Sequence, residues 1–107
     1  VIVNCKLSIV NYFMPKLWLV CYDVKDDKRR AKLAKLIEQR CQRVQYSVFE
    51  CPLDDKELNY QLEKRWLKVL KLNEDNLRVY PLDETAKQNT RVYGSDPPYQ
   101  PPDYLIL

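Results

Sequence analysis

The sequence contains no histidine, and its single glycine is Gly94. Without histidine, neither a Ser-His nor a Cys-His nucleophile is available, and a histidine general acid or base is excluded. A single glycine cannot build the glycine-rich loop that holds phosphate groups. The longest uninterrupted apolar run, 17–21, has five residues, far short of the roughly 18 that a membrane-spanning helix needs. These absences exclude several enzyme classes and predict that the chain does not enter a membrane.

The four cysteines, Cys5, Cys21, Cys41 and Cys51, are widely separated and form no CxxC pair. A zinc site normally uses closely spaced cysteine and histidine ligands, so none is expected. The last three cysteines have apolar neighbours, among which free cysteine usually behaves as a small buried hydrophobe. Residues 1–13 lack the basic start and the small-residue cleavage site of a secretory signal. We therefore expect free thiols and a protein of the reducing cytoplasm.

The 107 residues fit one domain. A chain of this size buries only about 60–70% of the surface it exposes when unfolded, so dimerisation is a natural source of further stability. Residues 1–13 precede Met14 and are expected to be an N-terminal extension or the result of a misassigned start. The domain is expected at 14–94. Residues 95–107 contain four of the seven prolines and are expected to be an extended tail.

Hydrophobic periodicity predicts a chain of alternating strands and helices. The expected elements are a buried strand at 17–24, a helix from Asp26 or Asp27 to about 42, a strand pair at 43–53 divided near Ser47, a helix at 55–72, a strand at 77–82 and a short strand at 91–93. The expected core residues of the two helices are Ala31, Leu33, Ala34, Ile37, Cys41, Leu58, Leu62, Trp66, Val69 and Leu70. Asp54 and Glu57 have the spacing of a capping box before the second helix. This order predicts an α+β protein with the ferredoxin-like β-α-β-β-α-β fold and an extra short C-terminal strand.

The net charge of +3 is small, but its distribution is uneven. One stretch gathers seven basic residues: Lys28, Arg29, Arg30, Lys32, Lys35, Arg40 and Arg43. A solvated helix face is the simpler explanation of one basic helix, and contact with nucleic acid is the alternative.

Asp23 is unusual because it places a carboxylate at the end of an apolar strand. Burying a carboxylate is costly unless it is paired, capped or bound to metal. One possibility is that Asp23 caps the following helix or pairs with Arg29, Arg30 or Arg43. The other is a Mg²⁺ site, in which a two-fold axis brings Asp23 and its copy together. The residues alone favour the first possibility.

Three segments together resemble the second core CRISPR-associated protein family, Cas2. They are LVCYDV at 19–24 with DDKRR at 26–30, then RVQYSVFE at 43–50, and finally LRVYPL at 77–82. The resemblance covers 14–94 in order and spacing. It implies a ferredoxin-like homodimer in the complex that captures foreign DNA and inserts it into a CRISPR array, with the Cas1 integrase as partner. Some family members are metal-dependent ribonucleases or DNases, and others are non-catalytic scaffolds, so the resemblance leaves both roles and both substrates, RNA and DNA, open.

The resemblance also implies a function for Asp23 at the end of the first strand. It implies that Asp23 binds one Mg²⁺ shared between the protomers and takes part in catalysis, with Tyr22 beside it. Phe49 matches a phenylalanine of the family, and packing in the core or at the dimer contact is expected for Phe49 and Tyr46.

The expected nucleic-acid contacts are Arg29, Arg30, Lys32 and Arg43. Arg30 and Arg43 fall where family members have functional arginines. Lys32 stands where some relatives have arginine, which keeps the charge but loses the planar, two-pronged geometry of a guanidinium. A third possibility, a small-molecule regulatory domain of the same fold, is disfavoured because the chain has no glycine-rich ligand loop.

Overall fold

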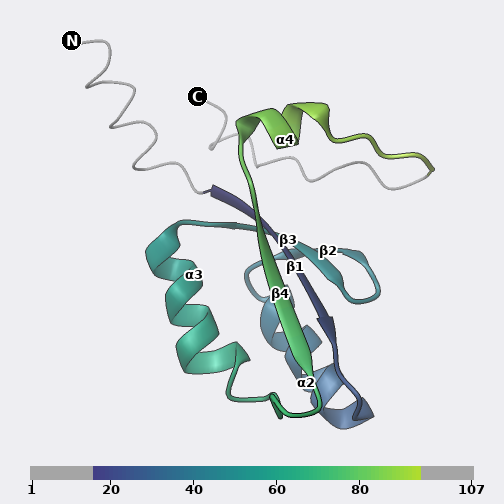
Figure 1. Ribbon diagram of the computed structural model, residues 1–107, viewed down its shortest axis with the longest axis vertical. Coiled ribbons are helices and arrows are strands. Elements are labelled where there is room, and N and C mark those ends of the chain that lie inside the picture. The colour runs from purple at the N-terminus through teal and green to yellow at the C-terminus, as the bar shows by residue number, and fades with distance from the viewer. Residues whose placement is uncertain (1–15, 95–107) are drawn as a thin grey trace.

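The structure, a computed structural model, describes residues 16–94 (Figure 1). Along the chain lie β1 (Lys16–Asp23), α2 (Asp27–Glu38), β2 (Gln42–Gln45), β3 (Val48–Leu53), α3 (Asp55–Gln61), the π-helical segment η1 (Leu62–Trp66), β4 (Asn76–Leu82) and α4 (Glu84–Asn89). The expected extension at 1–13 and the expected tail at 95–107 lie outside the described residues. No described helix is long and apolar enough to cross a membrane, and the cytoplasmic location stays a prediction.

The four strands form one antiparallel sheet in the order β2-β3-β1-β4. The strands β1 and β2 lie on either side of β3, and β3 and β4 lie on either side of β1. Each half of the domain is thus a strand-helix-strand unit divided by a strand from the other half, and α2 and α3 pack against the same face of the sheet (Figure 1). The ferredoxin-like α+β fold that the sequence predicts is confirmed.

The two faces of β1 have different neighbours, because successive residues of a strand point to opposite faces. Val20 and Tyr22 are buried in one cluster with residues of α2, β3 and α3. Leu19, Cys21 and Asp23 alternate with them and therefore point to the face that α2 and α3 leave uncovered. The hydrophobic core thus lies between the sheet and its two helices, and the other face of the sheet carries further apolar residues.

The helix α2 begins as the sequence predicts and ends earlier. Asp26 caps it by accepting a hydrogen bond from the backbone N–H of Arg29 at 2.9 Å. The helix ends at Glu38, since the chain from Gln42 onward is already paired in β2. Ala31 is exposed, which corrects its placement in the core. Three residues before Ala34, it falls about 60° to one side of that residue on the helix, at the edge of the buried row. The buried residues of α2 are Leu33, Ala34 and Ile37.

The second long helix contains a π-turn that the sequence analysis did not predict. Asp54 accepts a hydrogen bond from the N–H of Glu57 at 2.7 Å, while the Glu57 carboxylate pairs with Arg40 at 2.6 Å. In η1 the N–H of Leu67 reaches back five residues to the carbonyl of Leu62 at 3.0 Å. The expected core row forms across this turn, with Leu58, Trp66 and Leu70 buried and Leu62 and Val69 packed partly buried beside them.

A short helix, α4, follows β4 at Glu84–Asn89, a stretch for which no helix or strand was predicted. Asp83 caps α4 by accepting a hydrogen bond from the N–H of Ala86 at 2.8 Å. The hydroxyl of Thr90 donates to the Ala86 carbonyl at 2.6 Å and closes its last turn. Residues 91–93 form no strand in the described part of the chain, so the predicted extra C-terminal strand is wrong. An aspartate in cap position was the signal for a helix.

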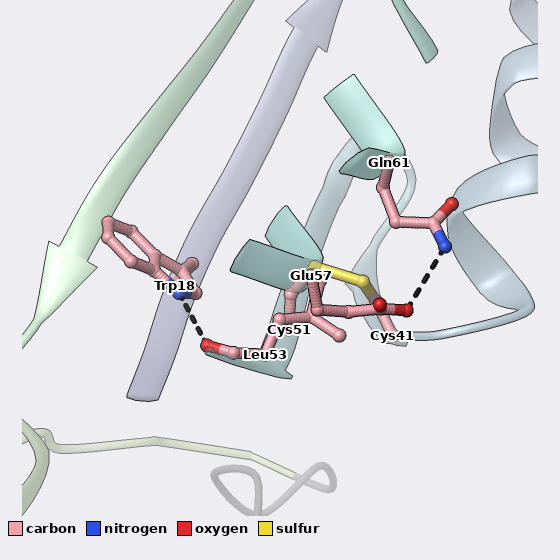
Figure 2. Close-up of a disulfide and its surroundings, with 6 residues drawn as sticks. All are labelled: Trp18, Cys41, Cys51, Leu53, Glu57 and Gln61. Atoms are coloured by element: carbon pink, nitrogen blue, oxygen red, sulfur yellow. Dashed lines mark hydrogen bonds between the residues drawn. A yellow bond between two sulfur atoms is a disulfide. The ribbon is translucent and has the colours of Figure 1, made fainter. Parts of the chain in front are cut away.

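Cys41 and Cys51 form a disulfide (Figure 2), which contradicts the expectation that both are free thiols. Cys21 is free and half-buried. In the β2–β3 ladder Gln42 pairs with Glu50, so the two cysteines are the next residues to face each other, with Cα atoms 4.3 Å apart. A bulge in β2 sets this register. Spacing along the sequence does not reveal such a register, and for that reason the disulfide was not predicted.

Candidate metal and nucleic-acid site

Asp23 is the last residue of β1, and its carboxylate is exposed to solvent. Its partner is the ammonium group of Lys25 at 3.2 Å, and 63% of the Asp23 side-chain surface is accessible. Asp23 does not cap α2, because Asp26 does, and it pairs with none of the three arginines considered above. The predictions of a cap or an arginine partner are therefore wrong, and the carboxylate has only a weak competitor for a metal ion.

No group of three or more histidine, cysteine, aspartate and glutamate side chains is positioned to hold a metal within residues 16–94. The described part of one protomer therefore supplies too few ligands around Asp23 to complete a metal site by itself. Asp23 lies on the uncovered face of the sheet, opposite Asn76 of β4. A two-fold contact between two copies through this face brings two Asp23 carboxylates together where its axis passes the end of β1. Mg²⁺ commonly takes one or two carboxylates and keeps several waters, so an exposed carboxylate from each of two protomers fits its ligand preference.

Tyr22 differs from Asp23 in its exposure, because the Tyr22 side chain is buried in the core. Its ring stacks on Phe49 with ring centroids 5.9 Å apart and 29° between the ring planes. Burial raises the pKa of the Tyr22 phenol, and the Arg43 guanidinium opposes that rise. Phe49 is fully buried. The structure places Tyr22 and Asp23 on opposite faces of the sheet and does not bring their functional groups together.

Arg43 organises the turn between β2 and β3. Its Nε donates to the carbonyl of Tyr46 at 2.9 Å, and its Nη1 donates to Glu38 at 2.9 Å. The guanidinium also lies over two rings, 5.2 Å from the centre of Tyr46 and 5.3 Å from that of Phe49. Tyr46 itself is 70% exposed, so its expected packing in the core is wrong, while its expected role at a dimer contact stays a prediction.

Arg30 holds the turn between β1 and α2. Its Nε and Nη2 donate to the carbonyl of Val24 at 3.1 and 3.0 Å, and its Nη1 donates to Asp27 at 2.8 Å. The Asp27 carboxylate and then the Tyr46 hydroxyl raise the pKa of Arg30, which places Arg30 near the β2–β3 turn. The structure thus brings Arg30, Arg43 and Tyr46 together at one corner, with most of the arginine donors already used within the fold.

Asp75 is a buried acidic residue to which the sequence analysis gave no role. Its carboxylate accepts hydrogen bonds from Nε and Nη2 of Arg29, and from the backbone N–H groups of Lys25 and Lys71, all at 3.0 Å. The hydrogen bonds from Arg29 are the main reason that the pKa of Asp75 lies well below its usual range. Asp75 in turn raises the pKa of Arg29. These bonds fix the turn that follows Asp23 against the loop that leads into β4.

No sequence signal could have identified Asp75, because Arg29 and Lys25 lie 46 and 50 residues away in the chain. The same pair explains why Arg29 is a poorer candidate for nucleic-acid contact than the sequence suggested: only 17% of its side-chain surface is accessible. Lys32 differs from the arginines. It is exposed on α2 and makes no hydrogen bond or ion pair with any residue in 16–94.

The chain is similar in sequence to known proteins of one family. A family model described as "CRISPR associated protein Cas2" matches residues 16–90. The chain is 64% identical over 90 residues to "CRISPR-associated endoribonuclease Cas2 2" of Synechocystis sp., a match that covers 84% of this chain and 97% of the relative. It is 48% identical over 67 residues to "CRISPR-associated endonuclease Cas2 2" of Thermus thermophilus, covering 63% of this chain and 73% of the relative.

The fold is similar to that of a solved chain in the "Partial Cas6-RT-Cas1--Cas2 complex". The two share 35% sequence identity with a TM-score of 0.68, and the match covers 86% of this chain and 99% of that chain. The similarity therefore extends over almost the whole of the solved chain.

Proposed function

The chain belongs to the CRISPR-associated Cas2 family, and on that basis we propose that it is a homodimeric subunit of a CRISPR adaptation complex. In this role a dimer bridges two copies of the Cas1 integrase and holds foreign DNA for insertion into the array. Cleavage of a phosphodiester with the help of Mg²⁺ is a second and separable activity of the same dimer.

The observation that carries the proposal is the match with a chain from a Cas1–Cas2 complex. It covers 99% of that chain, so the match is with almost the entire solved chain and not with a shared fragment. Fold alone would not suffice, because ferredoxin-like domains have many functions. Here the fold is accompanied by 35% sequence identity to that chain and by a family model that spans the described domain from 16 to 90.

The uncovered face of the sheet supports the dimer. By register, Cys21 of β1 lies beside Val48 of β3, and Leu19 lies between Glu50 of β3 and Tyr80 of β4. Leu19, Cys21 and Val48 are half-buried and Tyr80 is 42% exposed. A sheet with apolar residues on both faces needs a second layer on each. A second copy of the chain, packed face to face, supplies that layer. Light scattering at micromolar concentration should therefore give twice the 12.9 kDa monomer mass, and a clean monomer mass would contradict the dimer.

The Mg²⁺ activity rests on the position of Asp23 on this same face. Face-to-face packing gives a metal ion two carboxylates from one sequence position, one in each protomer. A bound Mg²⁺ would offset negative charge on a phosphodiester and supply an activated water. Asp23 would hold the ion, and Asp75 would keep the turn after Asp23 in place through its hydrogen bond from the N–H of Lys25.

Asp23→Asn separates the two activities, because it removes the charge that binds Mg²⁺ and keeps the size of the side chain. Mg²⁺-dependent cleavage of RNA and of DNA should be lost. Dimer mass and thermal stability should remain close to wild type, since an exposed pair such as Asp23–Lys25 contributes less than about 1 kcal/mol. Cleavage at the wild-type level in the variant would remove Asp23 from the mechanism. No cleavage in either protein, with DNA insertion intact in both, would leave the scaffold role alone.

A further inference from the structure

The arginines and the lysines of the domain are used in different ways. Most arginine side chains form a hydrogen bond or ion pair within the fold, namely those of Arg29, Arg30, Arg40, Arg43, Arg65 and Arg78. Most lysines of the two long helices and the turn after them do not: the side chains of Lys32, Lys35, Lys56, Lys64, Lys68 and Lys71 are exposed and have no partner in 16–94. The free positive charge of the described domain therefore lies mainly on its helical side.

One row of these lysines also contains an exposed aromatic residue. Lys56, Tyr60, Lys64 and Lys68 follow one another at intervals of four residues along α3, η1 and the turn after it. Tyr60 is 53% exposed. The row is offset by two residues from the core row that contains Leu58, and two residues correspond to about 200° around a helix. The row therefore points away from the sheet, into solvent.

The π-turn helps to keep this row straight. In an α-helix four residues exceed one turn of 3.6, so a row at this spacing drifts around the helix by about 40° per step. In a π-turn the hydrogen bond reaches back five residues, as that from Leu67 to Leu62 does, and four residues then fall short of a turn. The opposite drift in η1 offsets that of α3. From Lys56 to Lys68 the row extends over at most about 18 Å at 1.5 Å per residue.

The acidic side chains around the row are already paired. Asp55 forms an ion pair with Lys16, and Glu57 forms one with Arg40. Glu63 is the one carboxylate of α3 and η1 without a partner among the described residues. This part of the surface thus has three free ammonium groups and one free carboxylate, so its net charge is positive. The Tyr60 hydroxyl beside them can donate a hydrogen bond to a phosphate oxygen.

We propose that this row, Lys56, Tyr60, Lys64 and Lys68, binds the phosphate backbone of duplex DNA without regard to sequence. The inference rests on the proposed function and adds to it a surface that the family resemblance did not indicate. A length of about 18 Å corresponds to about five base-pair steps at 3.4 Å of rise. The row is on the opposite side of the domain from the uncovered sheet face, so it stays accessible when two copies pack through that face.

The test is the salt dependence of binding to a short labelled duplex, measured by fluorescence anisotropy on the full chain. Each neutralised phosphate contributes about −0.9 to the slope of log K against log salt concentration. The double variant Lys64→Gln/Lys68→Gln should therefore reduce the magnitude of the slope by about 1.8. The matched control, Lys16→Gln/Lys87→Gln, removes the same charge from lysines that are paired in the fold and should leave the slope close to wild type. Tyr60→Phe should weaken binding a few-fold and keep the slope.

The outcomes distinguish the row from the proposed function. Suppose that the wild type binds duplex with a steep slope and that the row variant, shown to be folded by circular dichroism, has the same slope. The proposed DNA contact of the row is then refuted, while the DNA-binding role of the protein stands. If the control variant flattens the slope as much as the row variant, binding depends on net charge and the row is again refuted. If the row variant binds DNA normally but no longer binds Cas1, the surface belongs to a protein partner. If the wild type does not bind duplex at all, the DNA-binding part of the proposed function fails and the row fails with it.

Discussion

Reduction of the Cys41–Cys51 disulfide should destabilise the domain substantially. The bond joins the residue before β2 to the middle of β3, and Figure 2 shows it beside Glu57 and Gln61 of α3. It therefore closes the hairpin that carries Arg43 and Tyr46. Two thiols in the same place would pack as small hydrophobes without new buried charge, so the expected cost is mainly the regained freedom of the unfolded chain.

The magnitude follows from the size of the closed loop. A separation of 10 residues gives a loop-closure entropy of about −9 cal/mol/K, equivalent to about 2.7 kcal/mol at 25 °C. For a domain of 60–100 residues, 1 kcal/mol shifts the melting temperature by about 4–8 °C. Reduction should therefore lower the melting temperature by about 10–20 °C. This is much more than the loss of one exposed ion pair would cause.

The assay is thermal unfolding with and without dithiothreitol, followed by circular dichroism. Cys41→Ser/Cys51→Ser should melt at a reduced temperature under both conditions, because it has no bond to lose. Cys21→Ser, which changes a free cysteine, should respond to dithiothreitol as the wild type does. A wild-type melting temperature that reductant leaves unchanged, together with titratable thiols at both positions, would refute the reasoning.

Two other predictions concern the dimer face and the buried carboxylate. Leu19→Lys should convert the dimer to monomer in light scattering, because it places a charge on the apolar sheet face. The control Leu72→Lys, at an exposed leucine away from the sheet, should remain dimeric. A Leu19→Lys variant that is still dimeric would contradict the proposed contact. Because the folded-state pKa of Asp75 is depressed below the unfolded value of about 3.9, its contribution to stability is present above that value and is lost as the pH falls below about 4. Asp75→Asn should therefore melt lower than wild type at neutral pH and approach it in acid; a difference that does not depend on pH would assign the loss to packing alone.

The sequence predicted the elements whose signals are local. The apolar run of β-forming residues identified β1, and Asp26 and Asp54 marked the starts of α2 and α3 as hydrogen-bonded caps. The division of the strand pair near Ser47 is confirmed by the turn between β2 and β3. Each of these features depends on residues within about one turn or one hairpin, so the sequence alone contains enough information.

Features that depend on distant partners could not be predicted in the same way. In the sequence Asp75 is one of several polar loop residues. It becomes a buried ion-pair partner only because folding brings Arg29 to it. The disulfide depends on the register of a bulged ladder. Asp23 was correctly placed at a strand end, but its surroundings were not foreseen: the arginines expected around it bond elsewhere, and Lys25 is its partner.

Spacer acquisition tests the central claim most directly. A host strain that supplies the cognate Cas1 integrase and a CRISPR array would be compared with and without this chain, and array length would be followed by amplification across the leader end. We expect the array to gain spacers when the chain is present, to gain none when it is absent, and to gain none with the monomeric Leu19→Lys variant. An array that expands equally well without the chain would contradict its role as a subunit of the adaptation complex.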